Sequence, residues 1–281
     1  MIELKNLTKK YDDFTAVNNL NLTIETGGFF GLLGPNGAGK STTIGMLSTL
    51  FLPTEGEILI DGEKLTRKNT ALKRRISVVT QEYSMRQDMT IEEIMEYQGR
   101  LYFVPKKERR EKTRELLEFC GLMDYRRRTV RKLSGGMKRK LMVCRALLTK
   151  PDILLLDEPT AGMDALARRQ MWNLLKKLNQ NRLTILLTTH YMEEAEILCD
   201  RVGLMDRGRL NEVDTPRAMI GRLGRYAVDH VSEEEMESRF FGTQEEAIRY
   251  LKGLKRDASL RNTTLEDVFL ERAGKKGTGE A

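Results

Sequence analysis

The chain has few cysteines and lacks long hydrophobic runs. Its three cysteines, Cys120, Cys144 and Cys199, are scattered without a Cys-x-x-Cys pair, which argues against a disulfide framework and against a structural zinc site. No apolar run approaches the ~18 residues that a membrane-spanning helix needs, and the N-terminus has no apolar signal-peptide core. We therefore expect a cytosolic protein with reduced thiols, neither exported nor anchored by its own sequence.

Length and composition are those of a globular protein. The 281 residues are long for one hydrophobic core, since such cores stop growing near ~250–300 residues. We therefore expect one large domain with a subdomain or an appendage. A hydrophobic content of 40% beside 32% charged residues excludes wholesale disorder, a coiled coil and a collagen-like repeat.

Basic residues are concentrated in part of the chain. Residues 222–281 hold 11 basic and 12 acidic side chains, so residues 1–221 carry a charge of +8 within the overall +7. Residues 126–145 contain nine basic residues and no acidic one. Such a block is found in contacts with nucleic acid, anionic lipid or a phosphate-rich ligand, although it is more often a solvated helix face.

Strand-like and helix-like patterns alternate along most of the chain. Hydrophobic and polar residues alternate in 2–7 and 20–24, which predicts strands with one buried face, and the apolar run 29–33 predicts a strand buried on both sides. The alternation predicts an α/β fold with a mostly parallel sheet and an antiparallel β part. Further strands are predicted at 57–60, 76–79, 153–156, 184–188 and 201–205, and helices at 91–102, 106–119, 165–178 and 244–254.

The pattern also predicts how the chain is divided. A mostly helical stretch interrupts the strand rhythm, so we expect an inserted helical subdomain at about 85–135 within a domain that spans 1–221. Toward the C-terminus the pattern weakens, and we interpret 222–281 as a small α+β extension. Its last amphipathic turn or two is expected at 264–270, and the tail 274–281 is expected to be frayed.

A glycine-rich turn directly follows the apolar strand at 29–33. Gly34-x-x-x-x-Gly39-Lys40-Ser41 fits the P-loop pattern of strand, turn and helix. Glycines let backbone N–H groups wrap around phosphates at a helix N-terminus, the lysine reaches the β- and γ-phosphates, and the serine hydroxyl binds Mg²⁺. We expect ATP and Mg²⁺ as ligands, with the nucleotide bound by Gly34, Pro35, Asn36, Gly37, Ala38, Gly39, Lys40, Ser41 and Thr42.

A second buried strand, 153–156, runs into two carboxylates. A P-loop ATPase needs one carboxylate near Mg²⁺ and often another that activates the attacking water. Asp157, last on the strand, suits the metal, and Glu158, one residue further, suits the general base. The competing interpretation of such an Asp-Glu pair is a helix cap or a solvated turn.

The residues Leu-Ser-Gly-Gly at 133–136 are not part of the general P-loop pattern and indicate a narrower class of P-loop protein. They begin 24 residues before Asp157, and His190 follows Asp157 by 33 residues. With the P-loop ahead of them and Gln81 between, this order resembles the ATP-binding subunit of ABC transporters over residues 2–221.

The resemblance implies a role for each matching residue. Tyr11 looks like the aromatic residue that stacks on adenine, with Phe14 as the rival candidate. Gln81 looks like the residue that senses Mg²⁺ and the γ-phosphate and couples them to the membrane partner. His190 looks like the switch that contacts the γ-phosphate, and Asp164 looks like the aspartate that crosses the dimer interface. Ser134, Gly135 and Gly136 look like the signature that grips the ATP bound on the opposite subunit.

The resemblance also implies an activity and partners. The chain is expected to be an ATPase in which Lys40 holds the transferring phosphoryl, and to power a separate transmembrane permease. One chain has one P-loop and one signature, so two copies or close paralogues are expected to pair head to tail. The expected location is the cytoplasmic face of the cell membrane, with no nucleic-acid partner. Met85, Met89 and residues 102–104 either dock the permease or pack the helical subdomain.

Some positions depart from the family's common pattern. Met137 stands where most members have glutamine, and 161–165 reads Ala-Gly-Met-Asp-Ala, which keeps the aspartate. The ending at 263–270 is similar to the branch that exports drugs, antibiotics, glycans or ions. An import ATPase is the alternative, and a soluble relative acting on nucleic acid or ribosomes is a weaker one, because the chain has a single P-loop and no cysteine pairs.

Overall fold

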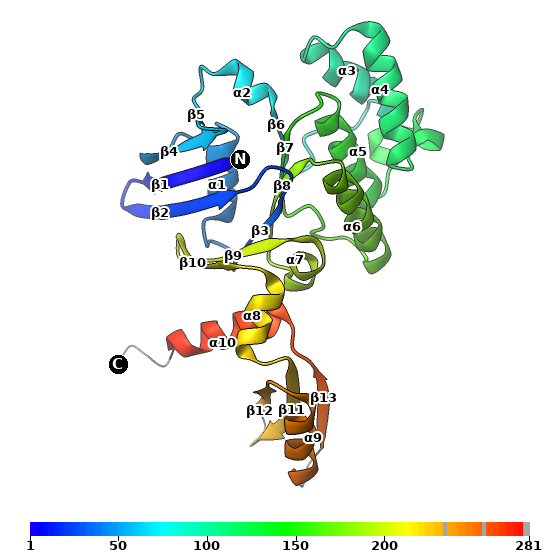
Figure 1. Cartoon of the computed structure of the whole chain (residues 1–281). Coiled ribbons are helices and arrows are strands. Elements are labelled where there is room, and N and C mark those ends of the chain that lie inside the picture. The colour runs from blue at the N-terminus through cyan, green and yellow to red at the C-terminus, as the bar shows by residue number, and fades with distance from the viewer. Residues whose placement is uncertain (233–234, 255–256, 278–281) are drawn as a thin grey trace.

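A six-stranded sheet forms the centre of the computed structural model, which describes residues 1–232, 235–254 and 257–277 (Figure 1). The strand order is β10-β9-β3-β8-β7-β6, and every neighbouring pair is parallel except β10 with β9. The predicted α/β fold with a mostly parallel sheet is confirmed. The strands are β3 (Phe29–Leu33), β6 (Ile76–Val79), β7 (Ile153–Asp157), β8 (Thr184–Thr189), β9 (Arg201–Asp206) and β10 (Arg209–Asp214).

A second, antiparallel sheet packs against this one, as the alternating N-terminal pattern predicts. Its strand order is β2-β1-β4-β5. Its apolar side chains share one buried cluster with α1 and with one face of the central sheet. The elements are β1 (Ile2–Tyr11), β2 (Phe14–Ile24), α1 (Lys40–Leu47), β4 (Glu55–Ile60), β5 (Glu63–Lys64) and α2 (Thr70–Arg74).

Alternate residues of the central strands face two different cores. In β3, Phe30 and Leu32 join the cluster shared with the antiparallel sheet, while Phe29 and Leu33 join the cluster shared with the helices. All five β3 residues are buried, as the continuous apolar run predicts. Burial of each such side chain stabilises the fold by about 1.5–3 kcal/mol, so this strand is held firmly where the P-loop begins.

Helices cover the other face of the central sheet and extend into a lobe formed by α3 and α4 (Figure 1). The lobe falls within the predicted helical subdomain, whose exact limits stay a prediction. None of the helices in the described residues is long and apolar enough to cross a membrane. The elements are α3 (Ile91–Leu101), α4 (Lys106–Phe119), η1 (Met123–Tyr125), η2 (Val130–Lys132), α5 (Gly135–Leu147), α6 (Ala165–Gln180) and α7 (Met192–Leu198).

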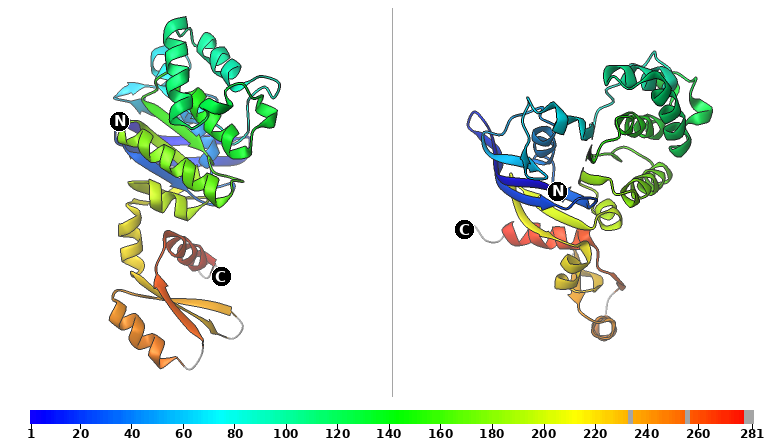
Figure 2. Two further views of the ribbon diagram at one scale, coloured as in Figure 1. Left: turned by 90° about the vertical axis from the view of Figure 1, so that its right-hand side faces the viewer. Right: turned by 45° about the horizontal axis from the view of Figure 1, so that its top comes forward.

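The C-terminal part forms a third sheet that projects from the core beyond α8 and α10 (Figure 2). Its strand order is β12-β11-β13 with α9 against it. The predicted domain boundary at 221 falls inside α8, and the division stays a prediction. Residues 274–277 of the predicted frayed tail belong to α10, while 278–281 lie outside the described residues. The elements are α8 (Pro216–Leu223), β11 (Tyr226–Ser232), β12 (Glu235–Phe241), α9 (Gln244–Gly253), β13 (Ala258–Asn262) and α10 (Leu265–Gly277).

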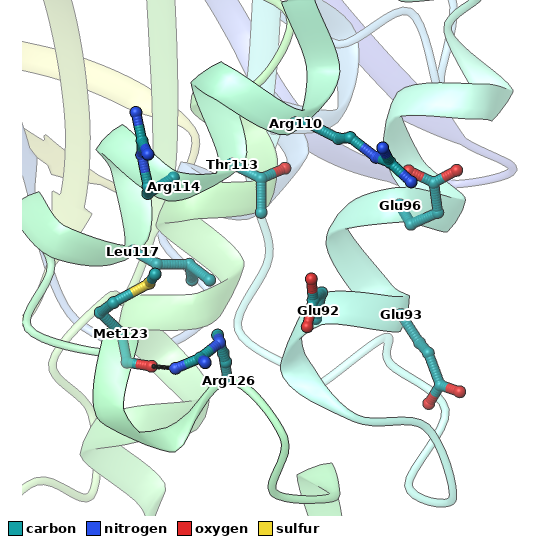
Figure 3. A pocket seen from close by; sticks show the side chains of 9 residues that line it. All are labelled: Glu92, Glu93, Glu96, Arg110, Thr113, Arg114, Leu117, Met123 and Arg126. Carbon is teal, nitrogen blue, oxygen red and sulfur yellow. Dashed lines mark hydrogen bonds between the residues drawn. The ribbon is translucent and has the colours of Figure 1, made fainter. Parts of the chain in front are cut away.

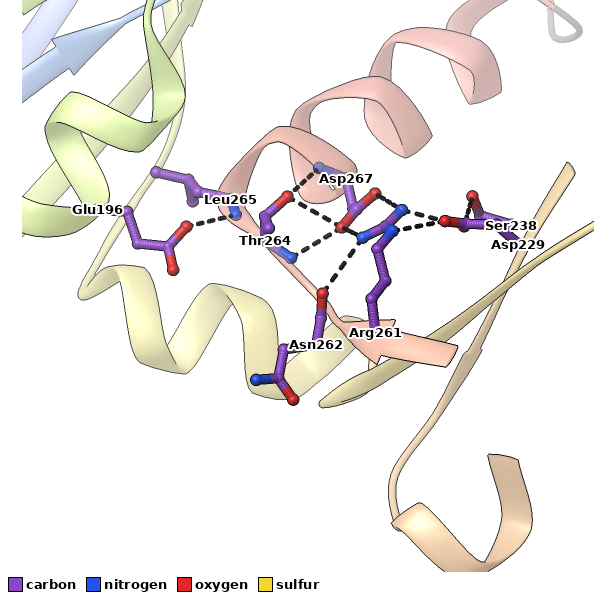
Figure 4. Close-up of polar contacts among 8 residues, drawn as sticks. All are labelled: Glu196, Asp229, Ser238, Arg261, Asn262, Thr264, Leu265 and Asp267. Atoms are coloured by element: carbon purple, nitrogen blue, oxygen red, sulfur yellow. Dashed lines mark hydrogen bonds and ion pairs between the residues drawn. The ribbon is translucent and has the colours of Figure 1, made fainter. Parts of the chain in front are cut away.

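One arginine joins the third sheet to α10 (Figure 4). Arg261 Nε donates to Asp229 at 2.6 Å, and its Nη1 donates to Asp267 at 2.7 Å. The backbone N–H of Leu265 donates to Glu196 of α7 at 3.0 Å, which ties the same segment to the core. This polar network therefore links the third sheet to α10 and, through Leu265, to the core.

Replacement of Arg261 by Met should loosen the third sheet, because Asp229 and Asp267 lose their shared cation. We expect a local loss of about 1–2 kcal/mol, read as faster amide hydrogen exchange in β11 and β13. Arg222→Met, which removes a cation paired with Glu212 and Asp214, is the control. Unchanged exchange in β11 and β13 would contradict the linking role.

Candidate functional site

The P-loop lysine, Lys40, is the first residue of α1 and is buried. Lys40 Nζ donates to the carbonyl oxygens of Gly34 at 2.8 Å and Pro35 at 3.0 Å. It also lies 3.8 Å from Glu158 Oε1. Burial lowers the pKa of Lys40, while the carboxylates of Glu158 and Asp157 act in the opposite direction. The ammonium is thus held in place by groups that a phosphate can replace.

Two loop glycines are required by close backbone contacts. A Cβ on Gly34 would lie 2.1 Å from the carbonyl oxygen of Met205, and one on Gly39, at φ +103°, would lie 2.4 Å from that of Ala16. The loop therefore lies tightly against β9 and β2, with its N–H groups at the start of α1. Among the other predicted loop residues, Ala38 is buried, Thr42 is half-buried, and Pro35, Asn36, Gly37 and Ser41 are exposed.

The acidic end of β7 lies beside the P-loop. Ser41 Oγ donates to Asp157 Oδ1 at 3.0 Å, and Thr188 Oγ1 donates to the same oxygen at 2.5 Å. The parallel register of β7 and β8 places Thr188 opposite Asp157. A hydroxyl and a carboxylate thus meet at the carboxyl edge of the sheet, where ligands of such α/β folds bind.

Glu158 is oriented by a strained backbone. It has φ +50° and is 5% exposed, and its N–H donates to the carbonyl oxygen of Thr188 at 3.0 Å. Its Oε2 lies 2.8 Å from His190 Nδ1. A non-glycine residue at positive φ costs about 1–3 kcal/mol, which persists only where the surroundings hold it. The carboxylate is therefore aimed between Lys40 and His190.

Three further predicted residues are exposed at the ends of elements. Gln81 lies just beyond β6. Ser134 caps α5 by accepting from the Met137 N–H at 3.3 Å, and Asp164 caps α6 by accepting from the Ala167 N–H at 2.8 Å. Gly135 and Gly136 form the first turn of α5, so the signature is a helix N-terminus, with a positive dipole end that suits an anion.

Tyr11 and Phe14, the two residues considered for stacking on adenine, are both exposed. Tyr11 ends β1 and is 40% exposed, with its ring 6.2 Å from that of Phe51 and the Lys9 ammonium 4.9 Å from its centre. Phe14 begins β2 and is 62% exposed, two residues before the Ala16 carbonyl that borders the P-loop. Both therefore stay candidates.

The sequence reasoning missed a buried carboxylate behind the site. Glu194 of α7 is fully buried and accepts from Thr160 Oγ1 at 2.8 Å and from Trp172 Nε1 at 3.0 Å. Burial raises its pKa. The signal was present, because helical periodicity places Glu194 beside the apolar Ala195 and Leu198 of α7.

A groove between α3 and α4 lies apart from these residues (Figure 3). Its lining includes Glu92, Glu93 and Glu96 opposite Arg110 and Arg114. With Arg126 the groove holds three arginines beside three carboxylates, so it offers a triphosphate no net positive charge.

Comparisons with known proteins agree with this geometry. The sequence pattern of the ABC transporter family matches residues 17–161. The chain is 37% identical to the linearmycin resistance ATP-binding protein LnrL of Bacillus subtilis, over 80% of the chain and 72% of that protein. It is 36% identical to Nod factor export ATP-binding protein I of Cupriavidus metallidurans, over 98% of each.

A solved structure is also similar to this chain. The dimeric structure of MJ0796, a bacterial ABC transporter cassette, superposes with a TM-score of 0.69 and 31% identity, over 76% of this chain and 98% of that one. The chain belongs to the ABC transporter family, as one of its ATP-binding subunits. It is an ATPase with a P-loop NTPase core, and subunits of this kind dimerise and act with a transmembrane permease at a membrane.

Replacement of Glu194 by Gln should change how stability depends on pH. Because the pKa of this carboxyl is higher in the folded than in the unfolded chain, the folded chain holds the proton more tightly. The contribution of the carboxyl to stability therefore falls as pH rises from the unfolded-state pKa to the folded-state pKa. Glutamine does not ionise. The Tm of E194Q relative to wild type should therefore increase as pH rises above the usual titration range of a glutamate carboxyl. Exposed Glu193→Gln is the control, and a constant Tm difference for E194Q would count against this assignment.

Proposed function

We propose that the carboxyl edge of the central sheet binds Mg²⁺·ATP and directs in-line attack of water on the γ-phosphate. The convergence of Lys40, Ser41, Asp157 and Glu158 carries this proposal. Hydroxyl and carboxylate oxygens are ligands that Mg²⁺ prefers. Besides Ser41 and Asp157, the proposed ligands are Gln81, as the family resemblance implies, together with phosphate oxygens and water.

Each side chain has a distinct task in this reaction. Lys40 exchanges its carbonyl partners for phosphate oxygens and holds the transferring group. Glu158 orients the attacking water and takes its proton, and His190, in contact with Glu158, faces the γ-phosphate. The rest of the catalysis is positioning and charge stabilisation.

A second copy or a close paralogue completes the site in this proposal. Ser134 and Asp164 are exposed at two helix starts, which suits contact with ATP held by another P-loop. Each pair of chains then forms two composite sites, with the nucleotide between them. Adenine stacks on Tyr11 or Phe14.

Glu158→Gln should trap this pair, because glutamine keeps the size of the side chain but cannot accept the proton. We expect ATP turnover to fall by roughly 10²- to 10⁴-fold. With ATP and Mg²⁺ the variant should elute as a dimer on gel filtration, and without nucleotide as a monomer. A variant with unchanged turnover and no dimer would contradict the assignment; exposed Glu193→Gln is the control.

We further propose that the chain drives export through a separate permease at the cytoplasmic face of the membrane. Support comes from two relatives that are named for linearmycin resistance and Nod factor export. The ending at residues 263–270 agrees with that branch. An import system is the alternative, and a neighbouring gene for a solute-binding protein would favour it.

The permease is proposed to dock on a groove beside the Gln81 loop. The groove is lined by Ser84, Tyr97, Leu101 and Tyr102, and the three larger side chains are each about half exposed. Phe103 follows them at φ +58° with 83% of its surface exposed. An exposed aromatic side chain on a strained backbone suits a partner contact.

The two methionines considered from the sequence do not form this surface. Met85 is buried, and Met89 is partly buried against the helical core. Their place is in the packing of the helical lobe.

Phe103→Gly should separate docking from folding. Glycine relieves the positive φ, so the free energy of unfolding should stay equal or rise by up to about 1 kcal/mol. ATP binding should be unchanged, while recovery of the co-purifying membrane protein should fall at least several-fold. Phe119→Ala, at the end of α4, is the matched exposed aromatic. Equal recovery of the membrane protein with Phe103→Gly and with wild type would contradict the docking proposal.

A further inference from the structure

A buried arginine on the signature helix holds the loop that carries Gln81. Arg139 of α5 is 2% exposed. Its Nη1 donates to the carbonyl oxygen of Thr80 at 2.6 Å, and its Nη2 donates to that of Gln81 at 2.9 Å. The planar guanidinium reaches the two carbonyls from separate nitrogens held in one rigid fork, a geometry that the rotatable ammonium of a lysine does not reproduce.

This arrangement is costly for the arginine. Within the described parts of the chain no ion pair joins Arg139 to a carboxylate, and its Nε has no hydrogen-bond partner. Burial lowers its pKa, with Tyr83 and Asp157 acting in the opposite direction. Besides the two carbonyls, the guanidinium meets the Tyr83 ring, 5.0 Å from its centre, and the Met142 sulfur at 3.9 Å. These neutral partners offset desolvation less than a carboxylate would, so stability alone is a weak reason for this residue.

Other contacts from α5 hold the same loop. Tyr83 Oη donates to the carbonyl oxygen of Gly135 at 3.3 Å. Arg145 donates to the carbonyl oxygen of Ser84 at 2.8 Å. The side chain of Gln81 itself is exposed, so its backbone is held while its amide is available to a ligand.

We infer that Arg139 is a positioning residue that places Gln81 for its part in binding Mg²⁺ with the nucleotide. This inference rests on the proposed nucleotide site. Without the guanidinium, the Gln81 carbonyl loses its anchor, and the side chain reaches the metal in a smaller share of conformations. Contacts of the P-loop with the phosphates do not depend on Arg139 and should persist.

A purely structural role makes a different prediction. Arg139 would then only satisfy the carbonyl groups beyond the end of β6, and its loss would lower stability and weaken ATP binding equally with and without Mg²⁺. The quantity that separates the two roles is therefore the gain in ATP affinity that Mg²⁺ provides.

The test uses the full chain with Glu158→Gln, so that ATP is not consumed, and isothermal titration with ATP in the presence of either Mg²⁺ or a chelator. Arg139→Met should reduce the Mg²⁺-dependent gain in affinity by about tenfold, the range seen when groups that orient metal ligands are lost. Affinity without Mg²⁺ should stay within about twofold of the parent. Arg139→Lys should lie between the two. Arg109→Met is the control, since Arg109 is also buried but pairs with Glu96 in the helical lobe.

Three results would overturn the inference: a full Mg²⁺-dependent gain in Arg139→Met, an equal loss with and without Mg²⁺, or the same loss in Arg109→Met. If Arg139→Met does not fold, Arg139→Lys decides alone by the same comparison. Failure of the proposed function has a separate signature, because the Glu158→Gln parent would then not bind ATP or would not dimerise with it.

Discussion

Side chains from three elements meet on one carboxylate oxygen at the edge of the central sheet. Ser41 comes from the start of α1, Thr188 from the end of β8, and both donate to Asp157 at the end of β7. This meeting requires β7 and β8 to be parallel and in register, and β3 to deliver the P-loop beside them. The doubly buried apolar strands provide that register, because a slip of one residue would exchange their two core faces.

Everything else in the site is arranged around this edge. The positive φ of Glu158 turns its carboxylate toward Lys40 and His190, and Glu194 ties the segment that follows Glu158 to α6 and α7. The exposed residues at the starts of α5 and α6 face outward instead, which agrees with a family whose members work as pairs.

Local sequence patterns predicted the central elements and the P-loop because both depend on short-range features. Continuous apolar strands and a glycine spacing are visible within a few residues. Thr188 and Arg139 were missed, because their roles come from a strand register and from a contact between segments about 58 residues apart. The C-terminal part was expected only as an α+β extension, without its individual strands, because β11 to β13 carry charged side chains such as Asp229 and Arg261 that break the apolar pattern.

The bonds of Lys40 have a consequence for which anions the loop accepts. Its ammonium is already satisfied by two carbonyl oxygens and lies near Glu158. An incoming anion must break these contacts and overcome the repulsion of nearby carboxylates before its own contacts with the loop contribute to binding. A single small phosphate offers few compensating contacts, whereas a chain of phosphates engages many N–H groups at once. The contacts of the resting lysine therefore favour a triphosphate over a single inorganic phosphate.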